Sequence, residues 1–189
     1  MHPYQKPTNA DLAAAENQTV PDIIAPELNV LFCGINPSVY TAAVGHNFAR
    51  PGNRFWPTLY QAGFTPHLFL PHEDKALLTY GYGITNVVAR ATVSADQLTG
   101  EEIKEGGKHL KAKVLEYKPL VLAVLGVTVY RKAFGYKQAA IGLQEHVIGN
   151  TRIWLLPNPS GLNAHYTPTA MATVYQQLRL YLDNDIKSK

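Results

Sequence analysis

Short apolar runs alternate with longer amphipathic segments along the 189-residue chain. Four runs are rich in branched and aromatic side chains and end at Gly, Pro or polar residues. This pattern is typical of strands that are buried on both faces of a sheet. We predict strands over residues 28–33, 84–88, 120–125 and 152–156.

Helical patterns lie between these runs. Thr99 and Glu102 have the spacing of a capping box, and Thr167 followed by Pro168 is a typical helix start. Asn53 is predicted to cap a helix whose Phe, Trp, Leu and Tyr residues are core positions. Helices are therefore expected over residues 53–60, 72–80, 99–117, 128–134 and 167–182.

The alternation of strands and helices indicates an α/β protein. We predict a three-layer α/β/α sandwich with a central, mostly parallel four-stranded sheet in one domain, residues 27–189. Residues 1–26 are polar and rich in Pro, and we interpret them as an N-terminal arm with room for a short helix over residues 9–17.

The composition excludes several classes of protein but does not indicate a function. Hydrophobic residues make up 46% of the chain and charged residues 16%, which indicates an ordered globular protein. The net charge of +3 permits a nucleic-acid partner without requiring one. The single cysteine, Cys33, excludes an internal disulfide and a Cys-rich zinc site. The longest apolar stretch, residues 120–127, is too short to span a membrane, and no secretory signal is recognisable, so we expect a soluble intracellular protein.

Two unusual loops follow predicted strands. One begins Gly-Ile-Asn-Pro-Ser at residues 34–38, and the other reads Pro-Asn-Pro-Ser-Gly-Leu-Asn at residues 157–163. Because ligands bind outside the carboxyl ends of parallel strands, both loops can meet at one cleft. They offer the amides of Asn36, Asn158 and Asn163 but no carboxylate. An amide orients water rather than deprotonating it, so the site suits a reaction whose leaving group departs readily and needs only a placed water.

These segments resemble a known family. Gly34-Ile-Asn-Pro37, then Phe48, then Pro51-Gly-Asn-Arg-Phe-Trp56, are similar to the signature of the mismatch-specific uracil/thymine DNA glycosylases of the uracil-DNA glycosylase superfamily. Asn158-Pro-Ser-Gly-Leu162 resembles the segment with which that family enters the DNA duplex. The resemblance covers roughly residues 22–182. It implies the uracil-DNA glycosylase fold and the hydrolysis of a base from DNA.

The resemblance also implies roles for single residues. Asn36 corresponds to the residue that positions the attacking water at C1′, and Phe48 to the aromatic that stacks on the flipped base. Asn158 is implied on the O2 side of the base, and the backbone near Ile35 and Phe48 is implied to bind its carbonyls. Asn86 is assigned to catalytic support.

Contacts with the DNA follow from the same resemblance. Leu162 is implied to enter the stack that the base vacates, and a G·U mismatch is the preferred substrate because its base flips out at lower cost. The implied partner is double-stranded DNA containing uracil or mismatches, and the implied product is an abasic site in base excision repair. We expect a monomer without cofactor or metal, cytoplasmic and nucleoid-associated in a bacterium or nuclear in a eukaryote. The remaining residues assigned to the DNA are Thr41, Ser160, Gly161 and Asn163.

One position departs from the family pattern. The usual glycine after Asn-Pro is Ser38 here. In the superfamily this position faces the 5-position of the pyrimidine, where a larger side chain excludes thymine. We therefore expect uracil to be a good substrate and thymine a poor one.

Several alternatives remain open at this stage. The enzyme can prefer another lesion, such as ethenocytosine or hypoxanthine. A non-catalytic mismatch-binding protein and a hydrolase of free nucleosides are further alternatives. Residue by residue, Asn36 can merely shape a turn and Phe48 can anchor a loop. We interpret Lys104, Lys108 and Lys111 as a solvated helix face, and His46 and His165 as loop residues. Tyr40 and Arg50 are interpreted as contacts to a DNA backbone, and the carboxylate of Asp96 has no assigned role.

Overall fold

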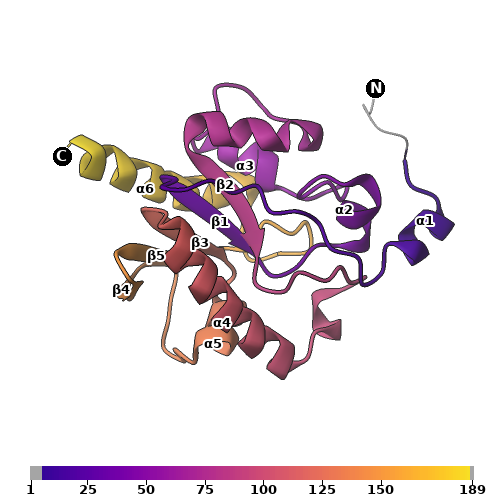
Figure 1. Cartoon of the computed structure of the whole chain (residues 1–189). Coiled ribbons are helices and arrows are strands. Elements are labelled where there is room, and N and C mark those ends of the chain that lie inside the picture. The colour runs from indigo at the N-terminus through magenta and orange to yellow at the C-terminus, as the bar shows by residue number, and fades with distance from the viewer. Residues whose placement is uncertain (1–5, 188–189) are drawn as a thin grey trace.

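The computed structural model of the chain describes residues 6–187. Within this range five strands form one sheet in the order β2-β1-β3-β5-β4 (Figure 1). The pairs β2–β1, β1–β3 and β3–β5 are parallel, and β4 runs antiparallel to β5. The strands are β1 (Val30–Gly34), β2 (Tyr82–Asn86), β3 (Val121–Leu125), β4 (Gly142–Ile148) and β5 (Thr151–Leu156).

The four predicted strands form the parallel part of this sheet, and the predicted number of four is corrected to five. The additional strand, β4, lies at the edge and is exposed along most of its length. It contains Gln144, Glu145 and His146 in succession. Because an edge strand packs little against the core, its sequence lacks the apolar run that identified the others.

Helices cover both faces of the sheet, as Figure 1 shows. Alternate residues of β1 serve the two faces: Phe32 belongs to one core cluster, and Leu31 and Cys33 belong to the other. The Phe32 face is covered by α3 (Phe55–Gln61), the 3₁₀ helix η1 (Pro71–Tyr80) and α6 (Pro168–Lys187), and the opposite face by α4 (Gly100–Tyr117) and α5 (Val127–Phe134). The three-layer α/β arrangement matches the prediction.

Local signals placed several helix ends correctly. The predicted capping box of α4 is present, with Glu102 N donating to Thr99 Oγ1 at 3.1 Å and Thr99 N donating to Glu102 Oε2 at 2.8 Å. Thr167 caps α6 by accepting from Ala170 N at 3.1 Å. The prediction that Asn53 caps α3 is wrong: the N-cap is Arg54, one residue later, and Asn53 lies just before it with its side chain accepting from Phe55 N at 2.9 Å.

Three short elements fall outside the predicted helices. They are α1 (Asn9–Ala14), which lies inside the segment where a short helix was allowed, α2 (Val39–Val44) and the 3₁₀ turn η2 (Ala95–Gln97). The segment that precedes β1 lies beside β2, where Ile23 exchanges backbone hydrogen bonds of 2.9 and 2.8 Å with Ile84. No helix within residues 6–187 combines the length and the apolar character needed to cross a bilayer.

The strand order determines where a ligand can bind. The chain leaves β1 toward β2 on one side and then returns to β3 on the other side. Such a reversal opens a crevice outside the carboxyl ends of the strands. The loops that follow β1, β2 and β5 border this crevice and carry the residues of the candidate site.

Candidate active site

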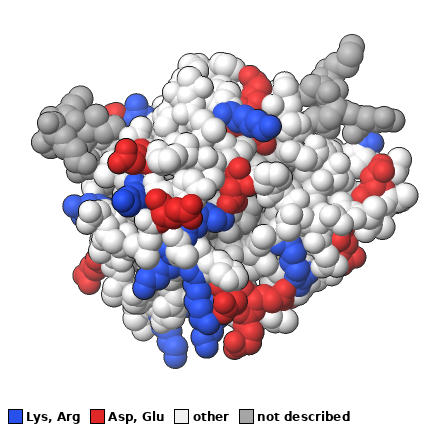
Figure 2. Space-filling view, viewed as in Figure 1, with Lys and Arg blue, Asp and Glu red and all other residues white. Residues whose placement is uncertain are grey.

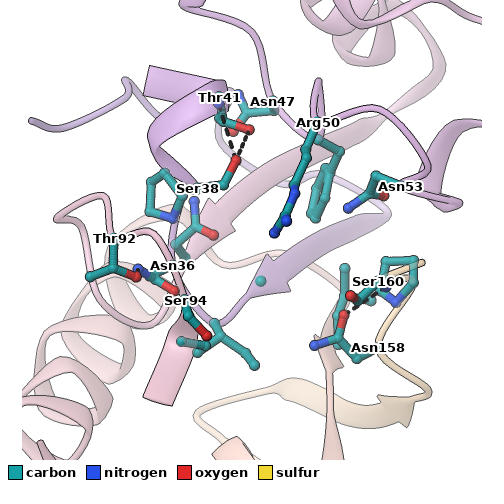
Figure 3. Close-up of a pocket in the computed structure, with 18 of the residues that line it drawn as sticks. Asn36, Ser38, Thr41, Asn47, Arg50, Asn53, Thr92, Ser94, Asn158 and Ser160 are labelled. Atoms are coloured by element: carbon teal, nitrogen blue, oxygen red, sulfur yellow. Dashed lines mark hydrogen bonds between the residues drawn. The ribbon is translucent and has the colours of Figure 1, made fainter. Parts of the chain in front are cut away.

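A cavity of about 210 Å³ lies at the carboxyl ends of the parallel strands (Figure 3). Its volume is below the range of pockets for drug-sized ligands and suits one small ring system. The sequence-predicted residues that line it are Ile35, Asn36, Ser38, Thr41, Phe48, Asn86, Asn158, Ser160 and Leu162. Two predicted residues, Gly161 and Asn163, do not line it and belong to the adjoining loop after β5.

The amide of Asn36 has one orientation that its neighbours allow. Its Nδ2 donates to the carbonyl of Arg90 at 3.0 Å and to Thr92 Oγ1 at 2.7 Å. Because a backbone carbonyl only accepts, the nitrogen must face Arg90, and the oxygen must take the other position. No residue that the structure describes donates to Oδ1. Asn36 therefore presents a free acceptor at the cavity wall.

The segment that holds Asn36 is itself anchored. Val39 N donates to the carbonyl of Thr92 at 3.0 Å, and Thr92 N donates to the carbonyl of Pro37 at 3.2 Å. Arg90 forms a salt bridge to Glu102 at 2.5 Å. This contact lowers the pKa of Glu102 to about 2, so the pair stays charged throughout the neutral pH range. The loop after β2 thus fixes the loop after β1.

Phe48 forms an aromatic wall of the cavity. It stacks on Phe55 with 3.9 Å between ring centroids and 22° between planes. Its backbone has a φ of 53°, which is unusual for an aromatic residue and stores on the order of 1–3 kcal/mol of strain. The preceding residue is secured by Asp74, which accepts from Asn47 N at 3.0 Å, and by the Trp56 indole, which donates to the Asn47 carbonyl at 3.1 Å.

Gly34 is a site residue that sequence reasoning did not single out. A Cβ at this position would lie 2.6 Å from Asn86 Oδ1 and 3.5 Å from the Phe48 ring. Asn86 is the Gly34 partner on the neighbouring strand. A glycine therefore allows the Asn86 amide and the Phe48 ring to approach the same point of β1.

Ser38 and Thr41 shape the rim above Asn36. Ser38 is the N-cap of α2, and its hydroxyl accepts from Thr41 N at 3.1 Å and donates to Thr41 Oγ1 at 3.1 Å. Thr41 is buried. The Ser38 side chain is therefore held in place, and its presence narrows the cavity beside Asn36.

The loop after β5 forms the opposite wall. Asn158 Oδ1 accepts from Ser160 N at 3.0 Å, and the Asn158 carbonyl accepts from Asn163 Nδ2 at 3.0 Å. This contact orients the amide, so that the donor Nδ2 is the group that points into the cavity in Figure 3. Asn163 thus supports the loop from outside the cavity.

Leu162 protrudes from the tip of this loop. It is 82% exposed, the largest value among the large hydrophobic residues that the structure describes. Its neighbour Gly161 packs against the 50–53 loop, where an added Cβ would lie 2.5 Å from the Gly52 carbonyl oxygen. An exposed leucine on a supported loop is available for insertion between bases.

Arg54 anchors the loop after β5 that carries Leu162. Its guanidinium donates to the carbonyls of Tyr166 at 2.7 Å, Ser160 at 2.8 Å and Asn163 at 2.7 Å. The pattern of sequence signals did not indicate this role, because a fork that binds three carbonyls depends on the tertiary fold. Arg54 is therefore a positioning residue for the tip that carries Leu162.

We expect Arg54→Met to lower the free energy of unfolding by about 3 kcal/mol, because it leaves three part-buried carbonyls without a charged donor. Chemical denaturation measures this loss directly. The matched control is Arg152→Met, since Arg152 is exposed on β5. Equal stabilities of the two variants would contradict the assignment.

Other residues considered from the sequence lie outside the cavity. Asp96 is not among the lining residues, and a hydrogen bond with the Ser94 side chain lowers its pKa. His46 contacts Asp74 at 3.6 Å, and His165 is exposed. Burial raises the pKa of the Cys33 thiol, in agreement with an inert core residue.

The lysines of α4 do not form a continuous basic surface. Figure 2 shows acidic side chains beside the basic ones in this part of the surface, and Lys108 forms an ion pair with Glu105 at 2.7 Å. This arrangement agrees with a solvated face. Within residues 6–187 no three His, Cys, Asp or Glu side chains gather into a group that could hold a metal ion.

The cavity differs in charge from an ordinary hydrolase site. No carboxylate lines it, and its only charged lining residue among those described is Arg50. Asn53 also lines it, and its side-chain oxygen accepts from Phe55 N. The chemistry available here is the placement of a water by an amide oxygen, the donation of hydrogen bonds and stacking on an aromatic ring.

Comparisons with known proteins identify the family to which the chain belongs. The model of the uracil DNA glycosylase superfamily matches residues 21–179. The fold is similar to a solution NMR structure of a candidate uracil DNA glycosylase from Methanosarcina acetivorans, with a TM-score of 0.54 and 18% identity over 86% of this chain and 98% of that chain. At this identity the second comparison concerns the fold alone. The match to the family model extends over the whole sheet and all the loops of the cavity, and the chain belongs to the uracil DNA glycosylase superfamily.

Proposed function

We propose that the protein is a mismatch-specific uracil-DNA glycosylase that hydrolyses the N-glycosidic bond of deoxyuridine, preferably in G·U pairs, and leaves an abasic site. Membership of the superfamily supports a glycosylase role. The observation that carries the finer proposal is the fixed Asn36 amide, whose oxygen is free inside a cavity without carboxylates. Ordinary glycosidases instead place two carboxylates around the reacting bond.

In the proposed reaction Asn36 Oδ1 accepts a hydrogen bond from a water and directs the water oxygen toward C1′. The C1′–N1 bond breaks with its electron pair going to the base, and the water oxygen bonds to C1′. The proton of the water passes to solvent or to the departing base. Because an amide orients water without deprotonating it, bond breaking runs ahead of water attack, and the sugar has oxocarbenium character in the transition state.

The base is held from two sides. Phe48 stacks on its face, an interaction worth about 1–3 kcal/mol per base. Asn158 Nδ2 donates to O2, where negative charge grows as the bond breaks, and backbone amides near Ile35 and Phe48 donate to the carbonyls. Asn86, which is paired with Gly34 at the ends of β2 and β1 and lines the cavity, supports the catalytic residues.

Leu162 is proposed to fill the space that the flipped nucleotide leaves in the duplex. The Gly161 and Asn163 backbones lie beside the opposite base, and Ser160 and Thr41 contact the DNA near the mouth of the cavity. The 82% exposure of Leu162 supports this role. A mismatched G·U pair is preferred because less pairing energy is lost on flipping.

The first test is base release from a duplex with one G·U pair, read as strand breakage after alkali treatment. The proposal expects breakage at the uracil position only after incubation with the protein. A panel of duplexes with ethenocytosine or hypoxanthine in place of uracil tests the choice of base. Release of those bases without release of uracil would contradict the proposed substrate.

We expect a G·U duplex to be processed about 10- to 100-fold faster than a G·T duplex, because Ser38 narrows the cavity where the thymine methyl group must fit. Single-turnover rates on the two duplexes measure this ratio. Ser38→Gly should reduce this ratio of rates. Because glycine is a slightly weaker N-cap for α2, the free energy of unfolding should fall by only a few tenths of a kcal/mol. A ratio of one for the unmodified protein would refute the assigned role of Ser38.

A further inference from the structure

Arg50 occupies an unusual position for an arginine at a surface. It lines the cavity, and the close-up shows its guanidinium directed inward between the walls that carry Asn36 and Asn158 (Figure 3). Its side chain forms no hydrogen bond or ion pair with any residue in the described part of the chain. An arginine without a partner, aimed into a cavity without a carboxylate, has its donors available for a ligand.

The neighbouring side chains offer the same kind of group. Asn158 Oδ1 is taken by Ser160 N, and Asn53 Oδ1 is taken by Phe55 N. Each of these oxygens already accepts one hydrogen bond, whereas both Nδ2 groups have unused donors, and the guanidinium of Arg50 can only donate. This wall of the cavity combines three donors with one positive charge. It complements a ligand edge that carries acceptors and negative charge.

We propose that Arg50 donates hydrogen bonds to the extruded base and stabilises the negative charge that the base acquires as the glycosidic bond breaks. This inference rests on the proposed glycosidase function and adds a residue that acts on the leaving group. The electron pair of the C1′–N1 bond spreads over N1 and the carbonyl oxygens of the base. Arg50 keeps all its protons throughout, because a guanidinium does not act as an acid in proteins. Its contribution is electrostatic and grows toward the transition state.

The alternative role for an exposed arginine near DNA is a phosphate contact, and the two roles predict different measurements. A phosphate contact contributes equally to bound substrate and transition state, so its loss weakens binding and reduces the salt dependence of binding by about one counterion. A contact with the leaving base contributes mainly to the rate at saturating protein.

The experiment compares Arg50→Gln and Arg50→Lys with the unmodified protein on a G·U duplex. At saturating protein we expect Arg50→Gln to lower the single-turnover rate about tenfold. The loss is no larger because an exposed donor contributes less than a buried one. Arg50→Lys should have an intermediate rate. The salt slope of duplex binding should not change. Lys104→Gln is the matched control, since it removes one positive charge from the exposed face of α4.

A second substrate separates charge stabilisation from a structural effect. In 5-fluorouracil the fluorine withdraws electrons and stabilises the departing anion, so the effect of Arg50→Gln should be smaller on that base than on uracil. Four results for Arg50→Gln would each overturn the role of Arg50. They are an unchanged rate at saturating protein, a lower salt slope of binding, an equal effect on the release of both bases, and a lower thermal midpoint than that of the unmodified protein. If the unmodified protein releases no uracil, the proposed function fails first, and that result is distinct from a failure of Arg50 alone.

Discussion

Asn36→Ala is expected to lower the single-turnover rate of uracil release by about 100-fold or more, because the water at C1′ loses the group that orients it. Binding of the variant to a G·U duplex should change little, since Asn36 faces the cavity and the loop that contains Arg90 rather than the outer surface. The measurement is a pair of experiments on one duplex: base release at saturating protein, and equilibrium binding.

The matched control is Asn150→Ala, which makes the same substitution in an exposed turn away from the cavity. It should leave both quantities unchanged. If Asn36→Ala retained full activity, the amide would be a turn residue only, and the cavity would require another way to place water. If the variant lost binding and activity equally, a structural role for the amide would explain the result.

Leu162→Ala is expected to reduce base release from duplex DNA by about 10- to 100-fold. Inserting a leucine into the stack is worth about 1.5–3 kcal/mol, and this energy offsets part of the cost of flipping. The reduction should be larger for an A·U pair than for a G·U pair, because a Watson–Crick pair resists flipping more strongly. Rates on the two duplexes measure the difference.

Leu180→Ala provides the control for Leu162→Ala, because Leu180 is also an exposed leucine, at 55%, and lies on α6 away from the cavity. Its rate should equal that of the unmodified protein. An equal loss on A·U and G·U duplexes would argue against insertion of Leu162 into the stack.

Much of the fold could be predicted because its strongest signals are local. The four parallel strands are buried on both faces and therefore appear in the sequence as apolar runs. Thr99 and Thr167 are N-cap residues, and each indicates the start of the helix that follows it. The edge strand β4 gave no such signal, because its residues are mostly exposed. Likewise α2 lies inside a loop whose Gly and Pro content indicated irregular structure, and only the capping by Ser38 reveals its start.

The candidate site also contains residues that could be predicted from the sequence and residues that could not. The motifs around Asn36 and Asn158 could be placed at one sheet edge because both follow strands predicted to be parallel, and the structure brings Asn36, Phe48 and Asn158 to one cavity. The roles of Arg54 and Gly34 could not be predicted in this way. Each depends on an approach between segments distant in sequence, Arg54 to the loop after β5 and Gly34 to Asn86.

The orientation of the amides is the most informative addition made by the structure. A sequence shows that Asn36 is an amide, but only its contact with the Arg90 carbonyl determines that its oxygen is the free group. For Asn158 the opposite holds, because Ser160 N occupies the oxygen. One wall thus presents an amide oxygen and the other an amide N–H, which suits the proposed placement of a water and the proposed hydrogen bond to the base.

The most direct test of this mechanism follows the oxygen of water into the products. A G·U duplex is incubated with the protein in water enriched in heavy oxygen, and the free base and the abasic strand are analysed by mass spectrometry. The account predicts free uracil without heavy oxygen, because the C1′–N1 bond breaks and the water bonds to the sugar, and a strand that stays unbroken before alkali treatment. Absence of free uracil, heavy oxygen in the released base, or strand breakage before alkali treatment would contradict it.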